Sequence, residues 1–133
     1  MGEGRGERFV LIVEDSETCA AALEIAFAAI PGLAVRLASS ATEALRILRA
    51  GDSPIRAVVT DLNMPLVDGF ELIRRIRLDG RHSGLPIIVI SGDTDPQTPE
   101  RVARMGVRAF FSKPYSPAEV RQKLEQILDA ETM

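Results

Sequence analysis

Five short apolar runs, rich in valine and isoleucine, constrain the fold of this chain more than any other feature. They span Phe9–Val13, Leu33–Ala38, Arg56–Thr60, Pro86–Ser91 and Arg108–Ser112. Each run is followed by a stretch in which apolar residues recur at helical spacing. Runs that are apolar on both faces suit parallel strands covered by helices on each side, because half-solvated antiparallel strands would alternate apolar and polar residues. The sequence therefore predicts an α/β domain with a central parallel sheet of five strands.

The helical stretches carry recognisable start and stop signals. Side-chain caps are predicted at Ser40-x-x-Glu43, Asp68-x-x-Glu71 and Ser116-Pro117-x-Glu119. Thr98-Pro99 predicts the start of a further helix, which ends at Gly106. The first helix is predicted to be largely buried because it contains Leu23, Ile25, Phe27 and Ile30, whereas the last helix is amphipathic.

Composition limits the classes of protein to which this chain belongs. The 133 residues suffice for one domain, predicted over residues 9–131 after a flexible N-terminal tail at residues 1–8, which is rich in glycine and charge. The formal net charge of −3 gives no basic surface for nucleic acid. No apolar segment approaches the ~20 residues of a membrane-spanning helix. The single cysteine, Cys19, is interpreted as a small buried residue of a cytoplasmic protein.

Polar residues follow the predicted strands at the edge where ligands bind to such sheets. In open parallel sheets this edge lies at the carboxyl ends of the strands. The residues found there are Glu14, Asp15, Asp61, Ser91 and Lys113. Three carboxylates at one edge repel one another, and a hard divalent cation such as Mg²⁺ would resolve the repulsion.

The remaining polar groups at this edge suit a phosphoryl group. A hydroxyl at Ser91 and an ammonium at Lys113 match the oxygens of a phosphoryl group in transfer. Carboxylates serve as nucleophiles in such transfers, and Asp61 is the most central of the three because it follows the third strand. We therefore interpret Asp61 as the acceptor.

In their order and spacing these residues resemble the signature of the response-regulator receiver family, the CheY-like superfamily of two-component signal transduction. The matching segments are Val13-Glu14-Asp15, Val58–Pro65 with Asp68-Gly69, Ile90-Ser91-Gly92 and Lys113-Pro114. Each segment alone is commonplace, but four segments in order at strand ends are specific. The match spans nearly the whole chain and leaves no residues for an output domain, so a stand-alone receiver is expected.

The resemblance implies a fold, a cofactor and roles for individual residues. The implied fold is flavodoxin-like, doubly wound (βα)5, with strand order 2-1-3-4-5 and helices on both faces. Mg²⁺ would be held by Glu14, Asp15, Asp61 and the backbone carbonyl of Asn63. Asp61 would take phosphate from the phosphohistidine of a histidine kinase or histidine phosphotransfer protein, and Ser91 and Lys113 would bind the phosphoryl oxygens. The Lys113–Pro114 peptide bond would be cis.

The resemblance also implies a switch. Ser91 and the aromatic residue Phe110 would move on phosphorylation and alter a protein-binding face formed by the fourth helix, fifth strand and fifth helix. The protein would act as a monomer or as a dimer promoted by phosphorylation. The family's usual tyrosine is replaced by Phe110, which lacks a hydroxyl that could report an inward or outward position, and plain core packing is the alternative role for this residue. Candidate residues of this face are Arg101, Arg104, Arg108 and Tyr115, although a plain solvated face fits them equally.

Two further polar residues, His82 and Asp93, each carry a prediction of their own. His82 lies in a predicted loop away from the acidic edge, so it is interpreted as a surface residue rather than a phosphotransfer residue. Asp93, like Asn63, lies two residues beyond a predicted site residue and flanks the path of an attacking water. This placement predicts a phosphoryl lifetime of seconds to minutes.

The expected function is that of a phosphoryl-accepting signalling domain, which is not an enzyme beyond self-phosphorylation from small donors and slow autodephosphorylation. Two other functions compete with it. A phosphatase of the haloacid dehalogenase type needs a second acid two residues after its nucleophile, and Asn63 stands there instead. A receiver-like module that binds partners without phosphorylation is the other alternative, although no acid of the site is missing. No glycine-rich loop follows the first strand, which argues against dinucleotide binding.

Overall fold

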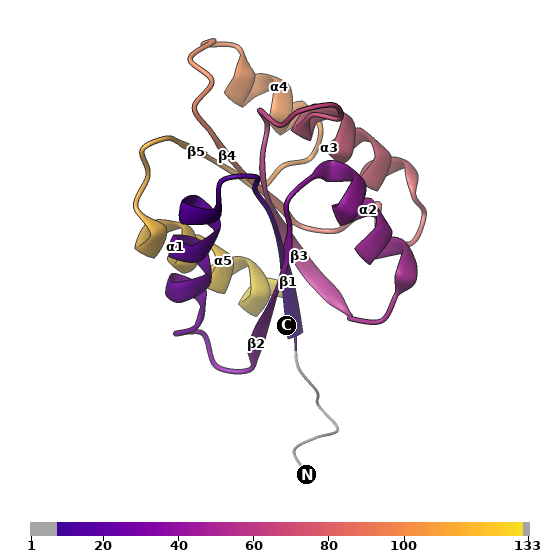
Figure 1. Cartoon of the computed structure of the whole chain (residues 1–133), viewed down its shortest axis with the longest axis vertical. Coiled ribbons are helices and arrows are strands. Elements are labelled where there is room, and N and C mark those ends of the chain that lie inside the picture. The colour runs from indigo at the N-terminus through magenta and orange to yellow at the C-terminus, as the bar shows by residue number, and fades with distance from the viewer. Residues whose placement is uncertain (1–7, 132–133) are drawn as a thin grey trace.

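The strands form a single parallel sheet at the centre of the molecule (Figure 1). The computed structural model describes residues 8–131. The strands are β1 (Arg8–Val13), β2 (Leu33–Ala38), β3 (Ile55–Asp61), β4 (Ile87–Ser91) and β5 (Ala109–Ser112). Their order is β2-β1-β3-β4-β5. The predicted fold class and strand order are confirmed, and every predicted strand is present.

Helices cover both faces of the sheet. They are α1 (Glu17–Phe27), α2 (Ala41–Ala50), α3 (Gly69–Leu78), α4 (Thr98–Arg104) and α5 (Pro117–Glu131). One apolar core lies between the sheet and α2, α3 and α4, and a second lies between the sheet and α1 and α5 (Figure 1). Because β1, β3 and β4 contribute side chains to both cores, these strands read as continuous apolar runs in the sequence.

The predicted helix caps are present. The Ser40 hydroxyl accepts a hydrogen bond from the Glu43 N–H at 3.1 Å, and the Asp68 carboxylate accepts one from the Glu71 N–H at 3.0 Å. The Ser116 hydroxyl caps α5 in the same way. These bonds satisfy amides that have no partner within their own helix. By contrast, the residue preceding α4 makes no side-chain cap bond.

Three predictions about the first part of the chain need correction. Ile25 is 75% exposed, and only Ala20, Leu23 and Phe27 of α1 are buried, so this helix is not buried throughout. Cys19 is partly exposed rather than buried. Arg8 is the first residue of β1 rather than part of a tail, and residues 1–7 of the predicted tail lie outside the described residues.

Arg77 connects α3 to the far end of α4. Its guanidinium donates hydrogen bonds to the carbonyl oxygens of Met105 at 3.0 Å and Gly106 at 3.0 Å, just beyond α4. It also donates to the carbonyls of Ser83 and Leu85, which precede β4. One side chain therefore fixes the C-terminal end of α4 against α3.

Over the described part of the chain, no helix combines the length and the apolar character that crossing a membrane requires.

Candidate functional site

The polar residues predicted at the carboxyl edge of the sheet do lie there. Glu14 and Asp15 follow β1, Asp61 ends β3, Ser91 ends β4, and Lys113 follows β5. One carboxylate oxygen from each of Glu14, Asp15 and Asp61 lies within 4.8 Å of the others. Parallel strands whose ends meet at one edge bring together residues that are far apart in the sequence.

Lys113 bridges two of the three carboxylates. Its Nζ donates hydrogen bonds to Oδ2 of Asp61 at 3.0 Å and to Oε1 of Glu14 at 3.2 Å. Glu14 and Asp61 are both buried, whereas Asp15 is exposed at the rim. The site therefore contains the ammonium of Lys113 and two carboxylates that are largely shielded from water, with a third carboxylate at the entrance.

Burial and neighbouring charge act in opposite directions on these groups. Desolvation raises the pKa of Glu14, and the charge of Asp61 adds to the rise. The hydrogen bond from the Ser16 amide and the nearby Lys113 lower this pKa but do not cancel the rise. Desolvation alone would lower the pKa of Lys113, but its hydrogen bonds to Asp61 and Glu14 and their charges outweigh it and raise the pKa. Lys113 is therefore a permanent cation at neutral pH.

The cluster has the composition of a site for a hard divalent cation. Three carboxylates face one ammonium, so negative charge remains in excess after Lys113 has paired. Burial is the main cause of the raised pKa of Glu14, and repulsion from the charge of Asp61 adds to it. Carboxylate oxygens are the ligands that such ions prefer, so Glu14, Asp15 and Asp61 could hold a metal ion.

Asn63 and Ser91 lie beside the cluster in different ways. The N–H of Asn63 donates to Oδ1 of Asp61 at 3.2 Å, so both oxygens of this carboxylate have a partner. Ser91 is fully buried one residue beyond Ile90, which pairs with Asp61 in the sheet. Its carbonyl accepts the N–H of Lys113 at 2.8 Å.

Gly69 supports the backbone of Asp61, a role that the sequence analysis missed. Its N–H donates to the carbonyl of Leu62 at 2.9 Å. A Cβ atom at this position would collide with the carbonyl oxygen of Asp61 and would lie 2.6 Å from the Cα of Leu62. Only glycine therefore permits this approach of α3 to the end of β3. A glycine directly after the capping Asp68 was the available signal.

Asp93, predicted to flank the path of an attacking water, uses both carboxylate oxygens in hydrogen bonds within its own loop. Its Oδ1 accepts the N–H of Asp95 at 2.9 Å, and its Oδ2 accepts the hydroxyl of Thr98 at 3.0 Å. Both oxygens are thus engaged within the loop that joins β4 to α4.

Two further predictions concern the residues around Lys113. The Lys113–Pro114 peptide bond is cis, as predicted. Phe110 pairs with Val89 and packs, partly buried, against the core on the side of α2, α3 and α4. Phe111 points to the opposite core. Phe110 therefore lies on the face of the sheet that α4 covers.

The candidate residues of the partner face are spread over two sides of the molecule. The guanidinium of Arg101 lies 3.7 Å from the centre of the Phe70 ring, and Arg104 pairs with Glu100 at 2.7 Å. Tyr115 instead packs against the core of α1 and α5 and lines an apolar hollow of about 460 Å³ with Cys19 and Lys113. Burial raises the pKa of Tyr115 to about 12.

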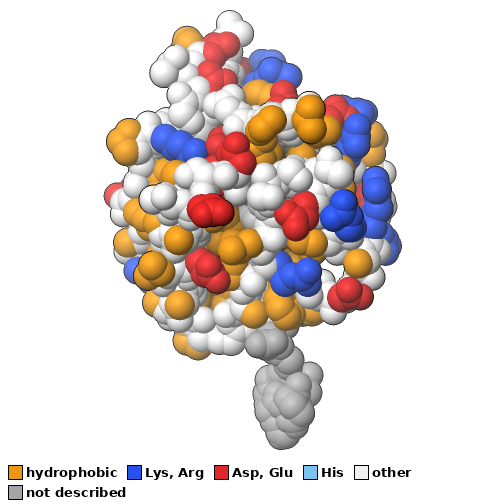
Figure 2. All heavy atoms as spheres, in the orientation of Figure 1, with side chains coloured by type: hydrophobic (Ala, Val, Ile, Leu, Met, Phe, Trp, Pro, Cys, Tyr) orange, Lys and Arg blue, Asp and Glu red, His pale blue; other side chains and the backbone are white. Residues whose placement is uncertain are grey.

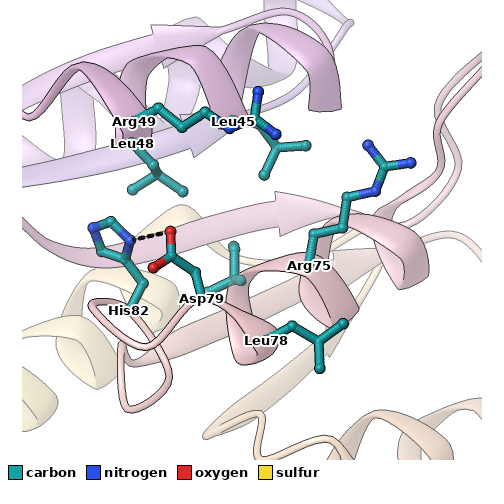
Figure 3. Close-up of a pocket in the computed structure, with 8 residues that line it drawn as sticks. Leu45, Leu48, Arg49, Arg75, Leu78, Asp79 and His82 are labelled. Carbon is teal, nitrogen blue, oxygen red and sulfur yellow. Dashed lines mark hydrogen bonds and ion pairs between the residues drawn. The ribbon is translucent and has the colours of Figure 1, made fainter.

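His82 is not part of the acidic cluster, but its interpretation as a surface residue needs correction, because its side chain is only 18% exposed. It is partly buried, and its Nδ1 lies 3.3 Å from Oδ2 of Asp79 (Figure 3). The two residues line a groove between α2 and α3 with Leu45, Leu48 and Leu78. Figure 2 shows basic side chains, which are arginines, gathered over this side of the molecule. The groove holds no residue predicted for the site.

The fold and the site together define a class of protein. A doubly wound parallel sheet whose carboxyl edge carries three carboxylates and a lysine is a flavodoxin-like α/β domain with a polar site that could hold a metal ion. Residues 10–125 match the model of the response regulator receiver domain. The chain belongs to this family, whose members are the receiver modules of two-component signalling systems.

Comparisons with individual proteins agree with this assignment. The chain is 29% identical over 119 residues to the chemotaxis protein CheY1 of Helicobacter pylori strain J99, covering 90% of this chain and 95% of the relative. It is 26% identical to a chemotaxis protein CheY homolog of Campylobacter jejuni, covering 90% and 91%. The crystal structure of a response regulator receiver protein from Pseudomonas putida is similar, with 32% identity, a TM-score of 0.81 and coverage of 91% and 98%.

Proposed function

We propose that Asp61 accepts a phosphoryl group from a histidine kinase or a histidine phosphotransfer protein and thereby switches a protein-binding surface. The observation that carries this proposal is the surroundings of the Asp61 carboxylate. It is buried at the carboxyl edge, it lies 3.0 Å from the ammonium of Lys113, and it shares a cluster with two further carboxylates. A carboxylate placed in this way suits nucleophilic attack on a phosphorus atom.

The proposed transfer needs little covalent chemistry from the protein. An oxygen of Asp61 forms a bond to phosphorus while the bond between phosphorus and the donor's imidazole nitrogen breaks, and the imidazole leaves with the bonding electrons. Lys113, which stays protonated, attracts the phosphoryl oxygens once they lie on Asp61. Ser91 uses its hydroxyl hydrogen to donate to one of these oxygens.

Glu14, Asp15 and Asp61, with the backbone carbonyl of Asn63, would hold Mg²⁺. Their oxygen ligands and excess negative charge fit this ion. The chemistry that Mg²⁺ supplies when bound is the neutralisation of charge on the phosphoryl oxygens. Asp15 matters most for access, because it is the exposed member of the cluster.

The proposed switch is a shift between two populations of conformations. A phosphoryl group on Asp61 draws Ser91 toward it and changes the positions of the β4–α4 loop and of Phe110. Phe110 lies on the face that α4 covers, so its movement would alter the surface made by α4, β5 and α5. A downstream protein that binds this surface would then recognise the phosphorylated form.

Intact mass spectrometry after incubation with Mg²⁺ and acetyl phosphate tests the proposal. We expect the wild type to gain one phosphoryl group in the presence of Mg²⁺ and not in EDTA. Asp61→Asn should gain none. Asp52→Asn, which removes an exposed carboxylate in the α2–β3 loop, is the matched control and should behave as the wild type.

The other outcomes separate the alternatives. No mass gain in the wild type with acetyl phosphate or phosphohistidine donors would support a module that binds partners without phosphorylation. Multiple-turnover release of phosphate from a phosphomonoester such as p-nitrophenyl phosphate would support a phosphatase. A phosphoryl group that Asp61→Asn also acquires would show that another residue is the acceptor.

A further inference from the structure

Asp93 joins the end of β4 to the start of α4. Its N–H donates a hydrogen bond to Oγ of Ser91 at 2.9 Å. Its carboxylate Oδ2 accepts the hydroxyl of Thr98, the first residue of α4, at 3.0 Å. One residue therefore contacts both the buried hydroxyl of the site and the helix on the proposed output surface.

Thr98 is a buried residue in an otherwise exposed segment. It is 4% exposed, whereas its neighbours from Thr94 to Gln97 and the two residues after it are exposed. Within α4, only Thr98 and Val102 are buried. A hydrogen bond from a shielded hydroxyl to a carboxylate is stronger than one between neutral groups, and its loss leaves a polar group without a partner. The Asp93–Thr98 contact is thus a principal attachment of the start of α4.

The opposite end of α4 is held by a separate residue. Arg77 bonds the carbonyls of Met105 and Gly106, and neither contact involves Ser91 or Asp93. Arg101, in the middle of the helix, lies over Phe70. The C-terminal end of α4 is therefore fixed independently of the site, and its N-terminal end is connected to Ser91 through Asp93.

We propose that Asp93 and Thr98 are positioning residues that hold Ser91 and the first turn of α4 in the unphosphorylated arrangement. The inference rests on the proposed function, because a phosphoryl group on Asp61 is what would attract Ser91 and so disturb the Asp93–Thr98 hydrogen bond. Ser91 Oγ accepts from Asp93, and its hydroxyl hydrogen remains to donate to a phosphoryl oxygen. A shift of Ser91 toward Asp61 pulls on Asp93 and, through its carboxylate, on Thr98.

The first part of the proposal is tested without any phosphodonor. Thr98→Val keeps the shape of the side chain and removes the hydroxyl, so Oδ2 of Asp93 loses its partner. We expect amide hydrogen exchange over residues 93–101 to become at least tenfold faster, with exchange in β1 and β3 unchanged. Thr98→Ser restores the hydroxyl and should restore slow exchange, which a loss of packing alone would not allow.

Thr94→Val provides the matched control for this experiment. It makes the same chemical change in the same loop, at an exposed threonine, and should leave exchange as in the wild type. Exchange in Thr98→Val that equals that of the wild type would overturn the proposal. Equal acceleration in Thr98→Val and Thr98→Ser would do so as well, because the hydroxyl would then have no role.

The second part is tested by the initial rate of phosphoryl uptake from acetyl phosphate with Mg²⁺. We expect Thr98→Val to be labelled three- to tenfold faster than the wild type, and Thr98→Ser and Thr94→Val to be labelled at the wild-type rate. If the wild type and Thr98→Val are labelled equally fast, this inference fails while the proposed function stands. If the wild type takes up no phosphoryl group, the proposed function fails. The proposal that the Asp93–Thr98 contact resists the movement of Ser91 toward a phosphoryl group then fails as well.

Discussion

At the scale of the residue, the backbone around Asp61 leaves no room for a side chain at Gly69. The atoms that a methyl group would meet belong to the backbone of Asp61 and Leu62, which cannot rotate away as a side chain can. Any substitution must therefore displace the segment that carries the proposed acceptor.

We predict that Gly69→Ala destabilises the protein by about 1–3 kcal/mol, the usual cost of overpacking. Urea denaturation measures this difference, and phosphoryl uptake should fall in the fraction that remains folded. Gly80→Ala is the control, because a Cβ atom there meets no other atom within 4 Å. Equal stability of Gly69→Ala and the wild type would mean that the loop after β3 adapts more easily than the structure indicates.

Leu66 is a second residue whose backbone is unusual. Its φ is +69°, which is unfavourable for a residue with a Cβ atom, and its side chain is fully exposed. We predict that Leu66→Gly stabilises the protein by about 0.5–1 kcal/mol, since relief of the left-handed conformation exceeds the added entropy of the unfolded chain. Leu66→Ala keeps the left-handed backbone and loses no buried surface, because the leucine side chain is already exposed. Its unfolding midpoint in urea should therefore match that of the wild type.

At the scale of the element, the first turn of α3 couples its stability to pH. Two arginines, Arg74 at 2.6 Å and Arg75 at 2.8 Å, bond the carboxylate of Glu71. Their hydrogen bonds lower the pKa of Glu71 from 4.5 to about 2. The folded state therefore favours the charged form, so this contribution to stability is complete above pH 4.5 and is lost as the pH falls toward 2.

We predict that Glu71→Gln loses less stability than the wild type between pH 5 and pH 3.5. Urea denaturation at the two pH values gives the loss of stability for each protein. The gap between the two losses should shrink in high salt, because Glu71 and its two arginines are accessible to solvent. Glu24→Gln, at an exposed glutamate of α1 with no ion pair among residues 8–131, is the control. A pH dependence in Glu71→Gln as steep as that of the wild type would contradict the prediction.

The predicted elements were confirmed where their causes are local. The caps at Ser40, Asp68 and Ser116 depend on residues three apart, and strand positions depend on short apolar runs, so the sequence alone contains this information. The convergence of Glu14, Asp61 and Lys113 required only the rule for parallel strands. The roles proposed for these residues remain predictions.

Features that depend on packing between elements were not accessible in the same way. Ile25 is an exception, because it lies two residues from both Leu23 and Phe27 and helical spacing alone already places it on the opposite side of α1. The hydrogen bond from Thr98 to Asp93 and the bonds of Arg77 to the end of α4 join residues whose side chains have several possible partners. Sequence spacing ranks none of these partners, and only the folded backbone selects one.

At the scale of the whole molecule, occupancy of the acidic cluster should stabilise the fold. A ligand that binds only the folded state at ten times its dissociation constant contributes about 1.4 kcal/mol. We predict that Mg²⁺ raises the thermal unfolding midpoint of the wild type by a few degrees relative to EDTA at equal ionic strength. Asp15→Asn should lose most of this increase, and Asp52→Asn should retain it. Calorimetric scans that respond equally to Mg²⁺ in all three proteins would place the ion elsewhere.

The parts that move in the proposed switch lie on one face of the sheet, although α5, which packs on the other face, completes the proposed output surface. The proposed switch uses α4 and Phe110 on one face of the sheet. The core of α1 and α5 on the other face does not need to change for that switch to operate. Unequal protection from hydrogen exchange, with the second core the slower to exchange, would follow from this division.

The position of Tyr115 gives the protein an intrinsic optical probe. The chain has one tyrosine and no tryptophan, so ultraviolet emission from the folded protein arises from a single ring. That ring is partly buried and lines the same hollow as Lys113 and Cys19. We therefore expect this emission to change when an ion or a phosphoryl group occupies the neighbouring acidic edge, so that binding can be followed in real time without any attached dye.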